Sequence, residues 1–383
     1  MSNVQIAEAC EGIPNGFFEA RDRIYANNPM EIPEDRAAVS AQFSASNPWL
    51  AYNEAASMCV EGKARTAVFA PDSLHIEGKR ACFFGYFESL DPPEDAEATQ
   101  TMLAQAESWA RKRGAESLFG PINFSTYNNY RIRLNAEPGA ITFPGEPYNP
   151  DYYRELLEAC GYRLHHGYRT QIAPIDHLTQ ARSAREACRA AIETEGFTIQ
   201  PLSHDKWLSS IDEFQLLIET TFRQNFAYTP LSKTLFRQAC GRSFIQKADP
   251  DVSVVCFSPG GEIAGFFLVY PHYGPLVIRG AGSRRLPVDA LDFATHWPQL
   301  QSLGHKVAIA KTVAVHPAFR RKGIMDAMSL ALLDQGEKRY ELWFGALIRD
   351  DNPSRNFGDS WETDSRTYGL FSKCLTAGRQ DSV

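Results

Sequence analysis

Three consecutive cations stand directly before Gly323: Arg320, Arg321 and Lys322. The apolar and β-branched residues of 307–315 predict a strand that Pro317 ends, and residues 323–338 predict a helix. A helix amino terminus offers unpaired backbone N–H groups and a partial positive charge. Cations alone would indicate a solvated turn, but the order strand, proline, cations, glycine and helix favours a pyrophosphate site.

The segment 315–324 resembles the acyl-CoA signature of the GNAT N-acyltransferase superfamily, in which a Val-x-Pro strand end precedes Arg/Gln-x-x-Gly-x-Gly/Ala. Met325 departs from this signature, because the family usually has Gly or Ala there. The resemblance implies that acyl-CoA is the co-substrate and that no metal is needed. The donor-binding residues that it implies are Val313, Ala314, Val315, Arg320, Arg321, Lys322, Gly323, Ile324, Met325 and Asn352.

Acyl transfer to an amine needs a neutral amine, a polarised carbonyl and a proton for the leaving thiolate. Many GNAT enzymes place a Glu on the strand before the Val-x-Pro, but here those positions hold Lys311 and Thr312. The base is therefore left open between solvent and three side chains: His316, His305 and Glu341 acting through a water. The resemblance implies that Tyr368, on a following helix, protonates the thiolate; the alternative is a Tyr that packs at a helix-to-sheet junction. The catalytic candidates are His316 and Tyr368.

Composition limits the class of protein. A chain of 383 residues predicts two domains, and 44% hydrophobic residues are enough for two packed cores. Since the net charge is −7, we expect neither nucleic acid nor an anionic membrane surface as a partner. The eight cysteines form no Cys-x-x-Cys pair, which indicates neither a zinc site nor a disulfide framework. Without a secretory signal or a spanning apolar run, we expect a cytoplasmic protein.

The first half of the chain predicts alternating strands and helices. They cover residues 64–76, 79–89, 94–113, 117–120, 152–160 and 162–172. This order, and the closing segment 153–162, resemble the second half of a GNAT domain. Where a phosphate loop would fall, residues 89–97 carry four carboxylates instead: Asp91, Glu94, Asp95 and Glu97. Because these would repel a pyrophosphate, we expect a degenerate copy that binds no CoA.

The second half predicts the same order with the loop in place. Its expected elements cover residues 208–223, 232–240, 252–257, 262–270, 307–315, 323–338 and 340–348. The fold expected is α/β, with two GNAT-like domains, each a twisted, mixed and mostly antiparallel sheet flanked by helices. The expected ranges are 1–175 for the degenerate domain, 176–195 for a linker helix and 196–383 for the acyltransferase domain. In the family, the strand after the central helix splays away from the one before it.

Two amide- and aromatic-rich segments are candidates for binding the acceptor: 225–230 and 120–130. Their candidate residues are Asn225, Tyr228, Asn123 and Tyr127. Such side chains orient small polar ligands, although they are equally typical of turns and edge strands. One hypothesis is that the first domain forms a wall of the acceptor pocket.

The function that these patterns indicate is acyl transfer, acetyl above all, from a CoA thioester to an amine of a small molecule such as an amino acid or a metabolite intermediate. The layout also resembles uncharacterised double-domain acetyltransferase-like proteins of bacteria. Two alternatives stay open. The donor could be an acyl carrier protein or an aminoacyl-tRNA, or the protein could be a non-catalytic acyl-CoA sensor.

Overall fold

The computed structural model describes residues 3–72, 74–135, 139–179, 182–352 and 364–376. The chain divides into two compact units. Unit 1 comprises Met1–Tyr168, Ile278–Gly280 and Thr367–Val383, and unit 2 comprises Arg169–Val277 and Ala281–Arg366. These ranges differ from the expected ones, because the carboxy-terminal segment from Thr367 belongs to unit 1 and the division falls inside a strand.

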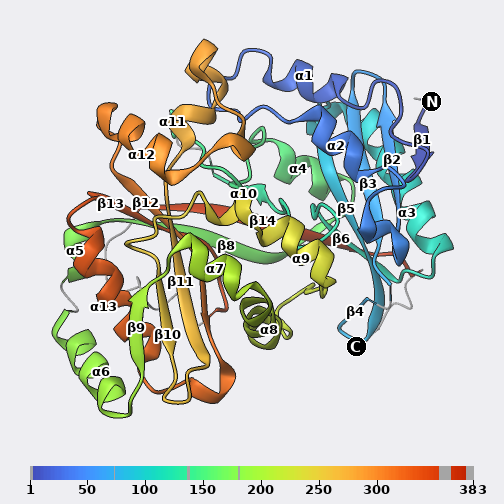
Figure 1. The fold of residues 1–383 in the computed structure, drawn as a ribbon. Helices are drawn as coiled ribbons and strands as arrows, with labels where there is room; N and C mark the ends of the chain where they lie inside the picture. Colours follow the sequence, from blue (N-terminus) through green and yellow to red (C-terminus); the bar gives the residue numbers. More distant parts are fainter. Residues whose placement is uncertain (1–2, 73, 136–138, 180–181, 353–363, 377–383) are drawn as a thin grey trace, which may run out of the picture. The chain divides into compact units, whose positions relative to one another are not determined.

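Unit 1 contains a mixed sheet in the strand order β1-β2-β3-β5-β6-β14-β8 (Figure 1). Strands β1, β2, β3 and β5 are successively antiparallel, whereas β5 and β6 run parallel with α3 between them in sequence. The elements are β1 (Gln5–Glu8), α1 (Glu19–Tyr25), α2 (Arg36–Gln42), η1 (Pro48–Ala51), β2 (Glu54–Val60), β3 (Ala64–Ala70), β4 (His75–Ile76), β5 (Lys79–Ser89), η2 (Pro93–Asp95), α3 (Glu97–Lys112), β6 (Ser117–Gly120), β7 (Ile132–Arg133), α4 (Tyr153–Ala159), β8 (Arg163–Pro174) up to residue 168, and β14 (Asp364–Cys374) from residue 367.

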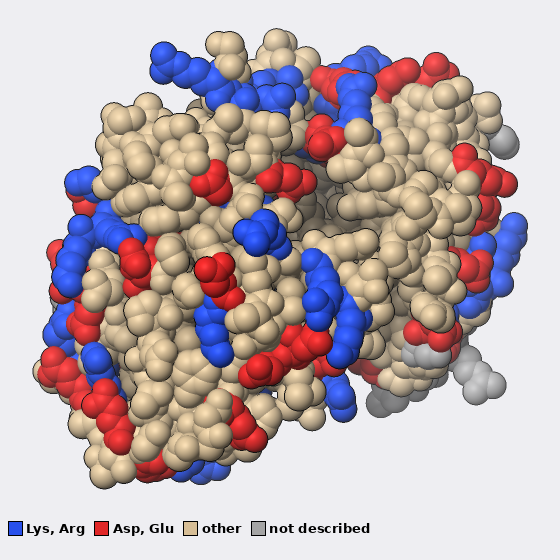
Figure 2. All heavy atoms as spheres, viewed as in Figure 1, with Lys and Arg blue, Asp and Glu red and all other residues tan. Residues whose placement is uncertain are grey.

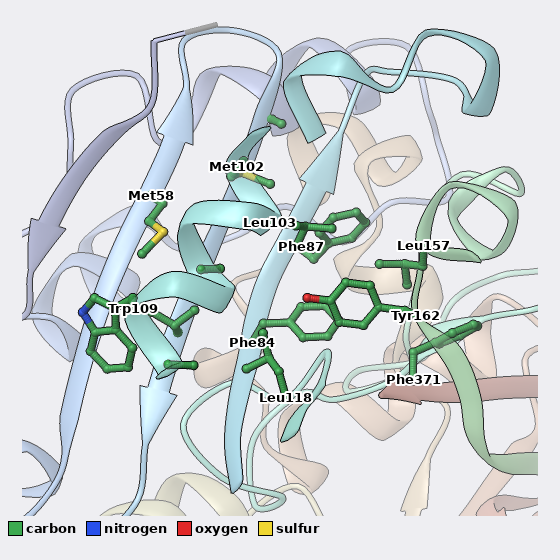
Figure 3. Close-up of a cluster of buried hydrophobic side chains, with 14 of the residues drawn as sticks. Met58, Phe84, Phe87, Met102, Leu103, Trp109, Leu118, Leu157, Tyr162 and Phe371 are labelled. Carbon is green, nitrogen blue, oxygen red and sulfur yellow. The ribbon is translucent and has the colours of Figure 1, made fainter. Parts of the chain in front are cut away.

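The core of unit 1 lies between this sheet and helices α3 and α4. The three-to-four spacing of apolar residues predicted one buried face of α3, and Met102, Ala106 and Trp109 are buried there. Figure 3 shows Met102 and Leu103 of α3 over the sheet, with Phe371 of β14 in the same cluster. The carboxy-terminal strand therefore completes the core of unit 1, which the sequence did not predict.

Unit 2 contains a second mixed sheet, in the order β8-β13-β12-β11-β10-β9. Strands β9 to β12 are successively antiparallel, and β12 and β13 run parallel with α13 between them in sequence. The elements are β8 from residue 169, α5 (Ile175–Thr179), α6 (Arg182–Thr194), β9 (Thr198–Pro201), α7 (His204–Ser209), α8 (Ile211–Phe222), α9 (Lys233–Cys240), α10 (Arg242–Ile245), β10 (Val254–Phe257), β11 (Ile263–Pro271), α11 (Gly274–Val277), η3 (Arg279–Arg284) from residue 281, η4 (Val288–Ala290), α12 (Phe293–Ser302), β12 (Val307–Val315), η5 (Pro317–Phe319), α13 (Ile324–Gly336) and β13 (Leu342–Arg349).

The predicted fold class is confirmed, because both units are mixed, mostly antiparallel sheets with flanking helices. Two expected helices differ in detail from the structure. The helix expected over 208–223 is α8, which begins three residues later because α7 ends at Ser209. The linker helix expected within 176–195 contains α6, which packs on α13 within unit 2, with Arg182 and Arg189 paired to Asp334. It is therefore part of the body of unit 2 and not only a connection.

Candidate functional site

Strands β12 and β13 pair only over their first halves. The parallel register runs from Val307 opposite Leu342 to Ala310 opposite Gly345 and ends there. Strand β13 then turns toward β8, because Leu347 adopts a φ of 62° and donates its N–H to Thr170 Oγ1 at 3.3 Å. The two strands therefore splay, as the resemblance implies for this pair.

Beyond the splay, β12 keeps its other neighbour. Val313 and Val315 remain opposite Phe267 and Gly265 of β11, after a bulge between Leu268 and Val269. The edge of β12 that faced β13 has no partner strand at residues 313–315 within the described ranges. Such an open edge can take an extended ligand whose amides continue the pairing pattern.

The turn after β12 ends at a helix start whose conformation strongly favours glycine. Gly323 has a φ of 85°, the left-handed conformation that side chains rarely adopt, and it is the N-cap of α13. A Cβ atom there would also lie 3.0 Å from Cys188 Cβ. The first N–H groups of α13 have no intrahelical partner and are free to donate to an anion.

The three predicted cations lie in this turn and are all exposed, but they differ in what they contact. Arg320 donates to the carbonyl oxygens of Val315 (3.4 Å) and Thr221 (3.3 Å), so it joins the strand end to the last turn of α8. Lys322 forms an ion pair with Glu195. Arg321, with a φ of 66°, has no ion pair or side-chain hydrogen bond with any described residue. Among the three cations, Arg321 is therefore the one whose guanidinium is not engaged by a described residue and could bind an anion.

Solved structures resemble the chain over nearly its whole length, at low identity. A tandem GNAT protein from the clavulanic acid biosynthesis pathway, without AcCoA, has a TM-score of 0.52 at 11% identity, covering 98% of this chain and 100% of that one. A "Probable N-Acyltransferase" from Enterococcus faecalis V583 has a TM-score of 0.52 at 8% identity, covering 97% and 72%. A glucosamine N-acetyltransferase region of a fungal multi-domain protein has a TM-score of 0.50 at 12% identity, covering 97% and 38%.

The chain has the tandem GNAT fold. Identities this low show the fold alone. No family model matches the sequence, and no curated protein matches it either.

In this tandem GNAT fold, the predicted acceptor loop of unit 2 follows α8, next to the contact between Arg320 and Thr221. Asn225 is exposed and Tyr228 is half-buried, and Tyr228 donates its N–H to the carbonyl oxygen of Asn225 at 3.2 Å. Asn225 and Tyr228 therefore follow, by four and seven residues, the Thr221 carbonyl that accepts from Arg320. Asn352 lies in the turn after β13, where its N–H donates to the carbonyl oxygen of Arg349.

The three candidate bases are placed less favourably. His316 caps η5, since its Nδ1 accepts from the Ala318 N–H at 3.2 Å, and a neutral ring with that bond carries its proton on Nε2. His305 precedes β12 and Glu341 precedes β13, where Glu341 pairs with Lys306 at 2.7 Å. His305 and Glu341 therefore lie at the opposite end of β12 from Gly323, about 25 Å of extended chain away. Whether either acts as the base stays a prediction.

The expected helix around Tyr368 is absent. Tyr368 lies on strand β14 of unit 1, is fully buried and donates its hydroxyl to Glu146 Oε1 at 2.7 Å. Its position and burial match the packed tyrosine that was the alternative interpretation. The catalytic role stays a prediction.

Strands β5 and β6 of unit 1 form a parallel pair like that of β12 and β13 in unit 2. In unit 1, however, the space beyond the end of the pairing is filled by residues of the chain itself. Strands β5 and β6 pair from Ala81 to Phe83, and residues 121–124 then fold back against β5. The Ile122 N–H donates to the Phe84 carbonyl oxygen at 2.7 Å, and Asn123 Oδ1 accepts from the Tyr86 N–H at 2.8 Å. Asn123 therefore satisfies a strand edge. Tyr127, in the turn that follows, is half-buried.

A carboxylate occupies the helix start of unit 1 that corresponds to the phosphate loop. Asp91 is buried, and its Oδ2 accepts from the Thr99 N–H in the first turn of α3 at 3.0 Å. This contact uses a helix N–H that a phosphate would need. Asp91 and the filled gap agree with the expectation of a copy that binds no CoA, which stays a prediction.

The described ranges contain no group of three or more side chains that could hold a metal ion, and no helix there is long and apolar enough to cross a membrane. A surface pocket of about 510 Å³ in unit 1 is lined by residues of 23–30 with Gly139 and Tyr148, so it contains no predicted site residue. On the face that Figure 2 shows, Lys and Arg lie among Asp and Glu.

Proposed function

We propose that the protein is an acyl-CoA-dependent N-acyltransferase, with acetyl as the simplest acyl group and an amine of a small molecule, such as an amino acid or a metabolite intermediate, as the acceptor. One observation carries the proposal. In unit 2, the gap between β12 and β13 opens beside a helix start that combines a left-handed Gly323 with a cationic turn.

The donor would use these features in order along β12. The backbone of Val313, Ala314 and Val315 would pair with the amides of the pantetheine arm, and the N–H groups of residues 323–325 would hold the pyrophosphate. Arg321 would add charge directly. Lys322 would exchange Glu195 for a phosphate oxygen. Asn352 and the half-buried Met325 are the other proposed donor-binding residues.

The chemistry requires little from the protein beyond positioning. The amine nitrogen forms a bond to the thioester carbonyl carbon, the carbon–sulfur bond breaks, the amine loses a proton and the thiolate gains one. Because Nδ1 of His316 already accepts a hydrogen bond and no carboxylate replaces Lys311 or Thr312, we assign the amine's proton to solvent. Asn225 and Tyr228 are the proposed acceptor-binding residues.

Thermal stabilisation by CoA, acetyl-CoA and longer acyl-CoAs tests the donor site. A ligand at one hundred times its Kd should stabilise the fold by about 2.7 kcal/mol. Arg321→Ala/Lys322→Ala should lose this effect. Arg284→Ala/Arg285→Ala removes two consecutive exposed arginines and the same charge from unit 2, so it should respond as the wild type does.

The outcomes separate the alternatives. Stabilisation with turnover of an amine supports the proposal, and stabilisation without turnover of any amine in a broad panel favours a sensor. If no CoA species stabilises the wild type, a free CoA donor is excluded, and an acyl carrier protein or an aminoacyl-tRNA becomes the donor to test.

Two variants test the catalytic assignments. Tyr368→Phe should lower the melting temperature, because Glu146 loses a buried hydrogen bond, while leaving kcat unchanged. A large fall in kcat with an unchanged KM would instead support Tyr368 as the acid. His316→Asn keeps a side-chain acceptor for the Ala318 N–H, so kcat should again be unchanged.

A further inference from the structure

Two buried arginines of unit 1 have no acidic partner. Arg131 is 8% exposed and Arg133 is 6% exposed, and within the described ranges neither has a carboxylate within 4.0 Å. Arg131 Nε and both Nε and Nη1 of Arg133 are buried without a hydrogen-bond partner in the part of the chain that the structure describes. Burying a guanidinium in this way costs several kcal/mol, so native proteins rarely leave one unpaired.

Unit 1 pairs its other buried arginine well. Arg65 is 1% exposed, and its guanidinium donates to both carboxylate oxygens of Glu34, at 2.7 and 3.0 Å, although its Nε too is buried without a hydrogen-bond partner among the described residues. The lack of an acidic partner at Arg131 and Arg133 is therefore a local property and not a general feature of this unit.

The two guanidinium groups are held by aromatic rings. Arg131 lies 3.5 Å from the ring centre of Tyr130, to whose hydroxyl it also donates, and 4.0 Å from that of Tyr168. Arg133 lies 4.5 Å from the ring centre of Tyr148. Stacking on ring faces fixes a guanidinium while leaving its in-plane N–H groups available to two oxygens of an oxyanion.

The backbone at this site is also fixed. The Asn149 side chain hydrogen-bonds both backbone polar groups of Arg133. It accepts from the Arg133 N–H at 2.6 Å and donates to the Arg133 carbonyl oxygen at 3.1 Å. Arg131 is held in a left-handed conformation with a φ of 82°, while its N–H donates to the Pro121 carbonyl oxygen. Strained residues of this kind are concentrated at ligand sites. Burial also lowers the pKa of Arg131 to about 10, because no anion offsets the loss of water.

We propose that Arg131 and Arg133 form an oxyanion-binding site in unit 1, which takes the carboxylate or phosphate group of a small molecule. This site is separate from the donor loop of unit 2 and does not depend on the proposed transferase activity. Arg133 lies on strand β7, and Arg131 directly precedes that strand. In the pairing of β7 with β14, Arg133 is opposite Tyr368.

Melting of the full chain in sodium malonate, sodium phosphate and sodium chloride at equal ionic strength tests the site. Malonate or phosphate should raise the melting temperature above its value in chloride, and the anion that does so identifies the oxyanion class. Arg133→Met should abolish that rise. Without the anion it should melt at or above the wild-type temperature, because an unpaired buried charge has been removed.

Three controls make the result decisive. Arg154→Met removes an arginine that pairs with Glu158 on the exposed face of α4, and it should keep the rise. Arg321→Ala/Lys322→Ala should keep it too, which separates this site from the donor loop. Arg133→Lys keeps the charge without the planar fork, and it should weaken the rise. The proposal is overturned if Arg133→Met melts well below the wild type without anion, if it keeps the rise, or if neither anion exceeds chloride.

Discussion

A Cβ atom on Gly323 would lie 3.0 Å from Cys188 Cβ and 3.1 Å from Cys188 Sγ. This relationship means that helix α6 packs directly on the start of α13, at the centre of the proposed phosphate loop. The loop therefore depends on glycine for two reasons: its φ of 85° and the space that α6 leaves.

Gly323→Ala tests this dependence. The substitution should lower the stability of unit 2 by more than the roughly 1–2 kcal/mol that a left-handed alanine costs, because Cys188 must also move. Gly261→Ala is the matched control, since Gly261 has a φ of 83° and nothing within 4 Å of the added atom. Calorimetric melting of both variants measures the difference. Equal losses would show that Cys188 does not crowd the loop.

Glu195→Gln should strengthen CoA binding. Glu195 pairs with Lys322, and both side chains are partly exposed, so their attraction amounts to about 1 kcal/mol or less. Releasing Lys322 should therefore lower the Kd for CoA by up to about fivefold. Isothermal calorimetry gives the value. Glu193→Gln changes a carboxylate at the end of α6, two residues before Glu195 and paired with Arg189, and it should change nothing. A weaker affinity for CoA in Glu195→Gln would mean that Lys322 does not reach the phosphates.

The buried pair of Arg65 and Glu34 makes unit 1 sensitive to acid. Burial raises the pKa of Glu34, but the Arg65 guanidinium, together with Arg21 and Arg36, holds that pKa below its ordinary value of 4.5. The stabilisation is therefore present above pH 4.5 and is lost as pH falls through the lowered pKa. At neutral pH, Glu34→Gln should cost about 3 kcal/mol, because it leaves Arg65 buried without its main partner.

The pH dependence of melting checks this prediction. The difference between wild type and Glu34→Gln should shrink below pH 4.5, where Glu34 in the wild type becomes protonated. Glu158→Gln breaks an exposed pair with Arg154 and should show little difference at any pH. A gap between Glu34→Gln and the wild type that stays constant down to low pH would contradict the assigned ion pair.

Asn123→Ala should destabilise unit 1 instead of impairing acceptor binding. Its Oδ1 is the acceptor for the Tyr86 N–H, and an unsatisfied buried donor costs about 1–3 kcal/mol. Asn128→Ala removes an exposed contact in the same turn and should cost far less. Melting temperatures and the acceptor KM are the measurements. An Asn123→Ala variant of normal stability with a raised KM would restore the acceptor role.

Most of the fold and the centre of the site could be predicted from the sequence, because both depend on local order. The strand, Pro317, the cationic turn and Gly323 lie within 307–323, and their conformations follow from β-branching, a fixed proline φ and the freedom of glycine. The carboxylates before α3 likewise predicted that the first copy lacks a phosphate loop.

The contacts of individual side chains could not be predicted, because their partners are distant in sequence. Arg320 binds a carbonyl oxygen 99 residues away, and Lys322 binds a carboxylate 127 residues away. The sequence presented three equivalent cations, and only tertiary packing left Arg321 without a partner among the described residues.

The secondary structure around Tyr368 could not be predicted either, because it depends on strands that are distant in sequence. Its motif position after β13 favoured a helix in the second domain, but β14 pairs with β6 and β7 and completes the sheet of unit 1. By itself, the sequence determined the local order of strand, cationic turn, glycine and helix, and so which residues are candidates for binding a phosphate. Only the tertiary structure decided which of them remain available, because strand pairing and long-range ion pairs are formed by the folded chain as a whole.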